Sequence, residues 1–285
     1  MQLLAPAKIN LSFQIKGRRP DGFHEIETLM VPVSLYDRIS LEKITGRDRT
    51  IQFSCNDKSI PAGEDNLVVR AAKLFRAASD IDDGIEISLK KNIPHGAGLG
   101  GGSSDAATTL MGLNELFSRI LETEQLVGLA AELGSDVPFF LAGSAAICRG
   151  RGETVEPAPL TKRFTLLLLK PEFGVPTPWA YGRWKDAQEI SGIDYAAQTF
   201  DGIRFINDLE RPVFEKFVIL PQLKTWLRAQ PGVAAALMSG SGSTIFTVLR
   251  DGADPNLISM QARQEIDPYL WTYACEAVDP TRGPG

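Results

Sequence analysis

The chain has 285 residues, and 30 Lys and Arg against 35 Asp and Glu give it a net charge of −5. This acidic balance argues against a nucleic-acid-binding protein, which usually carries a basic patch. The 44% hydrophobic content is too high for a disordered chain. The longest strongly apolar stretches, residues 164–169 and 233–238, fall far short of the roughly 18 residues that a membrane span needs.

The cysteines and the first residues indicate the cellular compartment. Cys55, Cys148 and Cys275 are far apart and match neither a disulfide framework nor a zinc site. Residues 1–10 lack the basic leader and apolar core of a signal peptide. We therefore expect a cytoplasmic protein without nucleic-acid or membrane partners. A monomer and a weak homodimer both remain open.

The first half of the chain predicts strands and then helices. Apolar and polar residues alternate on both sides of a turn cluster at residues 17–22, which predicts two strands. Asp65 precedes an apolar stripe of helical spacing, so we expect it to cap a helix. Residues 85–89 predict a strand that runs into a glycine-rich loop. After the loop, the pattern predicts two helices and then a strand pair, over residues 103–117, 123–133 and 144–156.

The second half begins after a polar, proline-bearing stretch at residues 156–163, which suits a boundary between domains. Beyond it, the pattern predicts strands over 164–169 and 271–277, a strand–turn–strand unit around 238–243, and helices near 179–185, 207–217, 222–229 and 256–266. Helices and strands do not alternate regularly, so we predict an α+β fold. We expect two subdomains, residues 1–157 and 163–278, and a loose tail at 279–285.

The glycine-rich loop at residues 94–105 predicts phosphate binding. Five glycines lie within residues 96–102, and without Cβ atoms the backbone N–H groups can converge on an anion. The N-terminus of the following helix adds its positive dipole end. The loop contains G-x-G-x-x-G spacing, but the strand that a dinucleotide-binding fold needs after this helix is absent from the pattern. Walker and protein-kinase motifs are also missing from the sequence.

Three segments in order, residues 5–11, 94–105 and 238–244, resemble the motifs of the GHMP kinases, which include galactokinase, homoserine kinase, mevalonate kinase and phosphomevalonate kinase. Residues 21–25 and 134–140 narrow the resemblance to one branch. Its members use ATP and Mg²⁺ to phosphorylate the 2-hydroxyl of a methylerythritol unit carried on a cytidyl diphosphate. The resemblance implies a two-subdomain fold, with an N-terminal part like ribosomal protein S5, a C-terminal α+β part, and the active site in the cleft between them.

By this resemblance, Lys8 and Asp136 are the catalytic pair. A carboxylate can accept the proton of the acceptor hydroxyl, and a neighbouring lysine can keep it ionised and neutralise developing charge. Each residue also has a structural alternative. Asp136 could cap a short helix that begins near Pro138, and Lys8 could protect an edge strand against aggregation.

The resemblance also implies the acceptor site. Phe23 and Tyr181 would sandwich the cytosine and His24 would hydrogen-bond its polar edge, although either ring could instead belong to the core. Tyrosine is frequent in the branch at the position of Phe23; phenylalanine keeps the stacking ring but lacks the hydroxyl. Asn10 and Thr177 could donate to the diphosphate or to the methylerythritol hydroxyls. The implied substrate-binding residues are Asn10, Phe23, His24, Thr177, Tyr181, Gly240, Ser241 and Gly242.

The ATP site implied by the resemblance combines an adenine pocket with the glycine-rich loop. Its residues are Asn66, Leu67, Pro94, His95, Gly96, Ala97, Gly98, Leu99, Gly100, Gly101, Gly102, Ser103 and Ser104. Ser103 or Ser104 could contact Mg²⁺, but the sequence has no carboxylate cluster that marks a dedicated metal site. Lys90 and Lys91 could screen phosphate charge or form a solvated strand end. The alternative functions are a homoserine- or mevalonate-type kinase and a non-catalytic ATP- or sugar-binding sensor.

Overall fold

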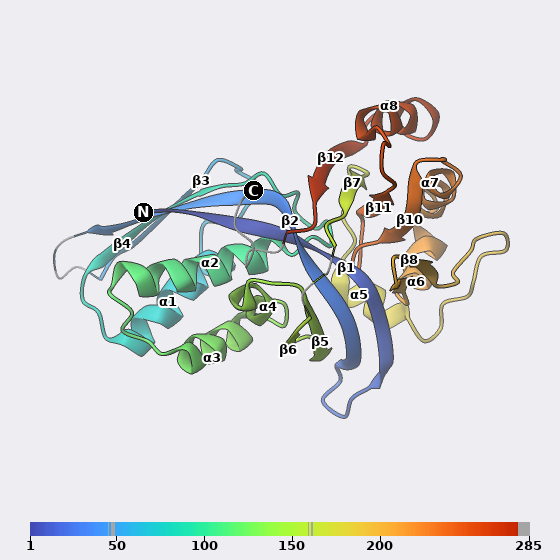
Figure 1. The fold of residues 1–285 in the computed structure, drawn as a ribbon. Coiled ribbons are helices and arrows are strands. Elements are labelled where there is room, and N and C mark those ends of the chain that lie inside the picture. Colours follow the sequence, from blue (N-terminus) through green and yellow to red (C-terminus); the bar gives the residue numbers. More distant parts are fainter. Residues whose placement is uncertain (45, 47–48, 159, 161, 279–285) are drawn as a thin grey trace.

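The strands form two β-sheets in the computed structural model, which describes residues 1–44, 46, 49–158, 160 and 162–278. The tail expected at residues 279–285 lies outside these residues. The first sheet has the order β3-β4-β2-β1-β9-β8, and β5 and β6 continue it from β2 (Figure 1). Its strands are β1 (Gln2–Arg18), β2 (His24–Ile44), β3 (Ile51–Cys55), β4 (Gly84–Lys90), β5 (Ala146–Gly150), β6 (Thr154–Pro157), β8 (Gln198–Phe200) and β9 (Ile203–Asn207).

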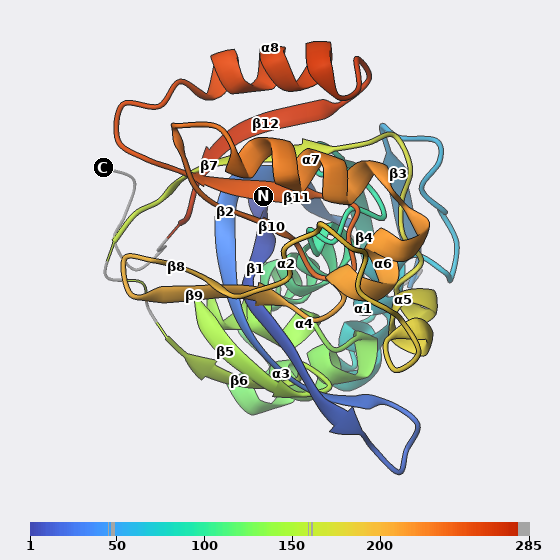
Figure 2. The same ribbon diagram turned by 90° about the vertical axis from the view of Figure 1, so that its right-hand side faces the viewer.

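The second sheet has the order β10-β11-β7-β12 and belongs to the second half of the chain (Figure 2). Its strands are β7 (Thr165–Lys170), β10 (Val233–Met238), β11 (Ile245–Leu249) and β12 (Trp271–Glu276). The parallel pairing of β9 with β1 brings a strand from the second half of the chain onto the first sheet. We retain residues 1–157 and 163–278 as proposed subdomains.

Helices cover both sheets. Those of the first half, which pack on one face of the first sheet, are α1 (Leu67–Ser79), α2 (Gly101–Leu116), α3 (Thr123–Leu133) and α4 (Val137–Ala142). Those of the second half are α5 (Thr177–Arg183), α6 (Glu210–Lys216), α7 (Ile219–Arg228) and α8 (Pro255–Glu265). This mixture of helices and largely antiparallel strands confirms the predicted α+β class.

The core follows the two-residue period of the strands. In β7, Leu166 and Leu168 belong to an apolar cluster between the two sheets, whereas Leu167 and Leu169 pack with the apolar residues of α7 and α8. Successive side chains of a strand point to opposite faces, so one apolar run serves two layers of core. This packing fixes the sheets against each other, and the sites described below lie near their junction.

Three local expectations need correction. Asn66, not Asp65, is the N-cap of α1, because its side chain accepts a hydrogen bond from the backbone N–H of Val68. The helix expected from Asn207 begins at Glu210, since Asn207 ends β9. The sequence pattern also did not reveal three short strands, β3, β8 and β9. Strand β3 forms one end of the sheet, and β9 and β8 form the other. With three to five residues each, they are too short for a clear alternation of apolar and polar residues.

Candidate active site

Lys8 lies in the middle of the long strand β1 and is only 4% exposed. Its backbone N–H donates to the carbonyl of Leu99 at 2.9 Å, so the glycine-rich loop covers the strand at this point. Its Nζ donates to Asn10 Oδ1 at 2.7 Å and to the Gly98 carbonyl at 3.1 Å. A role in guarding an exposed edge strand is therefore wrong. The Lys8 ammonium instead contacts the glycine-rich loop at Gly98.

Asp136 immediately precedes α4, and its Oδ2 lies 3.5 Å from Lys8 Nζ. It occupies the N-cap position, but within the described chain its side chain makes no capping hydrogen bond to the helix. One third of the side chain is exposed. The carboxylate is thus free to contact a ligand, as a proton acceptor requires.

The glycine-rich loop needs its glycines for close contact with the rest of the protein. Gly98 and Gly100 have φ angles of 74° and 68°, which favour residues without a Cβ. A Cβ at Gly98 would lie 2.1 Å from the Ser239 carbonyl oxygen, and one at Gly100 would lie 2.9 Å from Lys8 Cγ. The loop is therefore packed between β1 and the turn that joins β10 to β11. These contacts bring the three sequence motifs together.

Two cavities meet at Asp136. The first, of about 400 Å³, is lined by the following predicted residues: Lys8, Asn10, Asn66, Leu67, Pro94, His95, Gly96, Ala97, Gly98, Leu99, Gly100, Gly101, Gly102, Ser103, Asp136, Thr177, Tyr181, Gly240, Ser241 and Gly242. The second, of about 680 Å³, is lined by Phe23 and His24, among others. Both cavities share Ser103, Asp136, Thr177 and Tyr181. Two ligands could thus approach the same carboxylate from different sides.

Ser104 is the one predicted site residue that lines neither of these two cavities. It is fully buried in the first turn of α2, and its Oγ has no hydrogen-bond partner among the residues that the structure describes. Ser103, one residue earlier, lines both cavities. Of the two serines, Ser103 is therefore the one that can contact a ligand directly.

The aromatic residues of the second cavity differ in burial. Tyr181 packs edge-on against Phe13, and burial raises the pKa of its hydroxyl. The His24 ring lies 5.3 Å from that of Tyr181, and burial lowers the pKa of the imidazole, helped by the charge of Arg18. Phe23 is 51% exposed at the rim. Tyr181 thus has a partial core role, whereas Phe23 is open to a ligand.

Sequence reasoning missed Trp184, whose ring meets that of His24 edge-on at 5.8 Å and lines the same cavity. The sequence Pro-Thr-Pro-Trp-Ala-Tyr-Gly-Arg-Trp over residues 176–184 offered a signal. In α5 and the residue that ends it, Tyr181 and Trp184 are three positions apart and therefore share one face.

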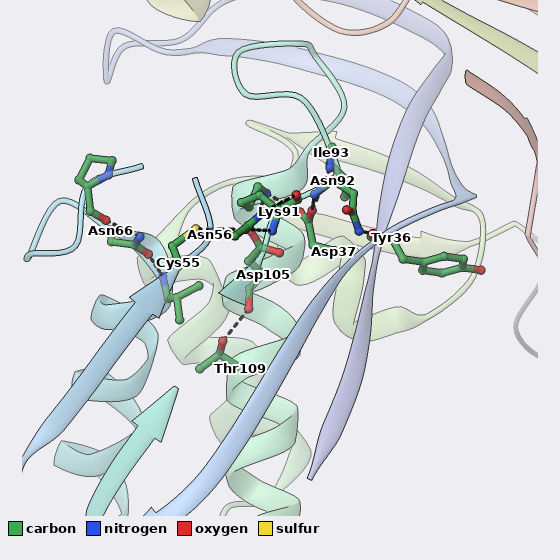
Figure 3. A network of polar contacts seen from close by, with 12 residues as sticks. Tyr36, Asp37, Cys55, Asn56, Asn66, Lys91, Asn92, Ile93, Asp105 and Thr109 are labelled. Atoms are coloured by element: carbon green, nitrogen blue, oxygen red, sulfur yellow. Dashed lines mark hydrogen bonds and ion pairs between the residues drawn. The ribbon is translucent and has the colours of Figure 1, made fainter. Parts of the chain in front are cut away.

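A buried ionic cluster holds both ends of the glycine-rich loop. Lys91 Nζ lies between Asp37 of β2 and Asp105 of α2, and its contact with Asp105 Oδ2 is 2.8 Å (Figure 3). Asp37 Oδ1 also accepts from the backbone N–H groups of Asn92 and Ile93 at 2.6 and 2.9 Å. Burial raises the pKa of Asp105 to about 7, despite the nearby Lys91 ammonium. The interpretation of Lys91 as a solvated strand end is wrong.

The described residues contain no group of three or more His, Cys, Asp or Glu side chains that could hold a metal ion. Oxygen donors at the junction of the cavities, the Ser103 hydroxyl and the Asp136 carboxylate, are the kind that Mg²⁺ accepts when phosphates supply the rest. In the same part of the chain, no helix is long and apolar enough to cross a membrane.

This arrangement, a glycine-rich loop at a helix N-terminus beside a lysine–carboxylate pair, defines a small-molecule kinase that uses ATP as its phosphoryl donor. Residues 66–144 match the family described as the GHMP kinases N terminal domain. The chain is 41% identical over 282 residues to the 4-diphosphocytidyl-2-C-methyl-D-erythritol kinase of Methylacidiphilum infernorum (isolate V4), with 96% of each chain covered. It is 42% identical to the enzyme of the same name from Syntrophotalea carbinolica (strain DSM 2380 / NBRC 103641 / GraBd1), covering 87% of this chain and 89% of the relative. The chain belongs to the family of 4-diphosphocytidyl-2-C-methyl-D-erythritol kinases.

Solved structures agree with this assignment. A crystal structure of 4-(cytidine 5'-diphospho)-2C-methyl-D-erythritol kinase has 35% sequence identity and a TM-score of 0.78, covering 98% of this chain and 100% of the other. Homoserine kinase from Cytophaga hutchinsonii has 18% identity and a TM-score of 0.72, covering 98% of this chain and 94% of the other, which shows a shared fold. The predicted GHMP kinase fold is confirmed.

Proposed function

We propose that the protein transfers the γ-phosphoryl group of ATP to the 2-hydroxyl of 4-diphosphocytidyl-2-C-methyl-D-erythritol, giving the 2-phosphate and ADP. This reaction belongs to the non-mevalonate synthesis of isoprenoid precursors. The main support is the pair of cavities that meet at Asp136, one lined by the glycine-rich loop and the other by aromatic rings. Such a junction suits the transfer of a group between two bound substrates.

ATP occupies the first cavity in this proposal. Asn66 and Leu67 lie at the start of α1 and line the cavity, so they contact the adenine. The phosphates lie against the loop and the N-terminus of α2, where backbone N–H groups and the helix dipole favour negative charge. The turn at residues 240–242 closes the other side of the cavity.

Asp136 acts as the general base. It accepts the proton of the acceptor hydroxyl while the hydroxyl oxygen attacks the γ-phosphorus in line with the leaving oxygen of ADP. Lys8 Nζ, 3.5 Å from the carboxylate, neutralises charge on the phosphoryl oxygens. Asn10 Oδ1 and the Gly98 carbonyl orient this ammonium.

Bound together with the ATP phosphates, Mg²⁺ would neutralise part of their charge. Ser103 would hold it on the protein side, because its side chain lines both cavities, whereas Ser104 is buried. Among the described residues that line both cavities, Asp136 is the one that supplies a carboxylate.

The acceptor occupies the second cavity. Phe23 and Tyr181 present aromatic surface to the cytosine, and His24 hydrogen-bonds its polar edge. Burial lowers the pKa of His24, so the imidazole is neutral at pH 7 and can either donate or accept a hydrogen bond. Trp184 supports His24 from the side. Thr177, hydrogen-bonded to Ser241 at 2.8 Å, lies between the two substrates.

The test is a direct assay of acceptor choice. The purified protein is incubated with ATP, Mg²⁺ and one acceptor at a time, namely 4-diphosphocytidyl-2-C-methyl-D-erythritol, homoserine or mevalonate, and ADP is measured. We expect ADP only with the cytidyl acceptor, and almost none from Asp136→Asn protein under the same conditions. Turnover of homoserine or mevalonate instead would overturn the assignment. Binding of both substrates without any ADP would identify a sensor.

A further inference from the structure

Asn207, the last residue of β9, binds the start of the turn that joins β10 to β11 (residues 239–244). Its side chain is buried, and the residue is 4% exposed. Its Nδ2 donates to the carbonyls of Met238 and Gly240 at 2.7 and 2.8 Å. Its Oδ1 accepts from the backbone N–H of Leu209 at 2.9 Å. Both N–H donors of the amide are therefore used to hold this turn.

A second buried side chain holds the same end of β10. Glu210 Oε1 accepts from the backbone N–H of Met238 at 3.0 Å, and Glu210 Oε2 lies 2.5 Å from Lys224 Nζ. Both side chains of this ion pair are 2% exposed. Strand β10 is the end strand of its sheet, so side chains rather than a further strand bind the backbone of Met238 at this edge. Loss of these partners would leave buried polar groups unsatisfied, which is costly.

The turn lies against the Lys8 ammonium. A Cβ added to Gly240 would lie 3.3 Å from Lys8 Nζ and 3.1 Å from Asn10 Oδ1. Ser239, one residue earlier, donates from its Oγ to the Gly98 carbonyl at 2.9 Å. Asn10 Oδ1 and the Gly98 carbonyl also accept hydrogen bonds from the Lys8 ammonium. The turn therefore contacts both groups that orient this ammonium.

We propose that Asn207 is a positioning residue for the phosphoryl transfer, because it fixes the turn at Gly240 and, through the turn, the Lys8 ammonium. This inference rests on the proposed role of Lys8 and deepens it. Asn207 lines neither of the two cavities, so it acts through the turn and not by contact with a substrate. A small displacement of a group that neutralises developing charge slows the reaction strongly.

The experiment measures kcat and both KM values for Asn207→Asp. The carboxylate has nearly the size of the amide and still accepts from Leu209, but it has no N–H to donate to the two carbonyls. We expect kcat to fall about ten- to a hundredfold, with a smaller change in either KM, as for a catalytic group that is slightly misplaced. Asn207→Ala removes the donors without placing a charge in the interior. It should show the same loss, and it replaces the Asp variant if that variant does not fold.

The decisive measurement combines either change with Lys8→Met. If Asn207 acts through Lys8, its replacement costs little more in a protein that already lacks the ammonium, and the two effects are less than multiplicative. The same factor in both backgrounds, or an unchanged kcat in the single Asn207 variant, would overturn the inference and leave the proposed function intact. Near-normal kcat of Lys8→Met alone would overturn the proposed role of Lys8 and the inference with it.

Gln198→Glu is the matched control. Gln198 lies on β8, and its side-chain amide donates to the Ala236 carbonyl at 2.8 Å and accepts from the Ala236 N–H at 3.0 Å. The change likewise converts an amide into a carboxylate at the edge of β10, but two residues before Met238 and away from the turn. It should leave kcat nearly unchanged. A loss equal to that of Asn207→Asp would show that any weakening of this edge slows the reaction, and would overturn the assignment to Asn207.

Discussion

Replacing Asp105 by Asn should change how the stability of the protein depends on pH. Asp105 is 2% exposed, and its Oδ2 lies 2.8 Å from Lys91 Nζ, while Lys91 also pairs with the buried Asp37. One ammonium thus serves two buried carboxylates. Asn keeps an oxygen that accepts from Lys91 but cannot ionise, so the variant isolates the titration of this group.

The size and sign of this pH dependence follow from the pKa of Asp105, which rises from 3.8 to about 7 on folding, mainly because of burial. The unfolded chain releases this proton near pH 4, whereas the folded protein holds it until about pH 7. The contribution to stability is therefore full below about pH 4 and is lost as the pH rises through 7. One pH unit in this window corresponds to about 1.4 kcal/mol. From pH 5 to pH 7, the unmodified protein should lose about 2–3 kcal/mol relative to Asp105→Asn.

The measurement is the free energy of unfolding by urea at pH 5, 6, 7 and 8 for both proteins. The difference, variant minus unmodified protein, should increase up to about pH 7 and then level off. Asp251→Asn, which alters an exposed carboxylate in the turn after β11, is the control for the removal of a surface carboxylate. A constant difference for Asp105→Asn would refute the argument that burial, rather than Lys91, determines the ionisation of Asp105.

Three other predictions concern the site. Asp136→Asn and Lys8→Met should each lower kcat by about 10²- to 10⁴-fold with little change in substrate binding. In the double variant, kcat should fall by less than the product of the two single effects, since the two groups act together. Near-normal turnover of a folded Asp136→Asn protein would show that Asp136 is not the general base. Gly102→Val should weaken ATP binding, measured by calorimetry, while acceptor binding persists. The protein has space for the new Cβ, since its nearest neighbour would be Leu67 Cδ1 at 3.7 Å, but Gly102 lines the ATP cavity and the side chain would obstruct the phosphates. Unchanged ATP affinity would count against the loop as the phosphate site. Phe23→Ala should weaken acceptor binding by about 1–3 kcal/mol without changing stability, since the ring is half exposed, and a large drop in the melting temperature would instead indicate a core role.

The class of chemistry could be predicted from short motifs along the chain. A run of glycines before a helix has few roles other than close approach to an anion, and that property is local. The ordered motifs at residues 5–11, 94–105 and 238–244 were enough to predict the kinase class. Every predicted site residue except Ser104 lines one of the two cavities. The alternation of apolar and polar residues likewise predicted β1 and β2. A strand with one buried face shows this alternation in its own sequence, because successive side chains point to opposite faces of the sheet.

Contacts between segments far apart in the sequence select the role of each residue. Lys8 and Asp136 are far apart in the sequence, and their 3.5 Å contact depends on the loop being packed over β1. Asp65 and Asn66 are both good helix caps, and only the backbone conformation selected Asn66. The burial of Lys91 between two carboxylates leaves no local signal, because a lysine at a strand end looks the same in the sequence whether solvent or another strand faces it.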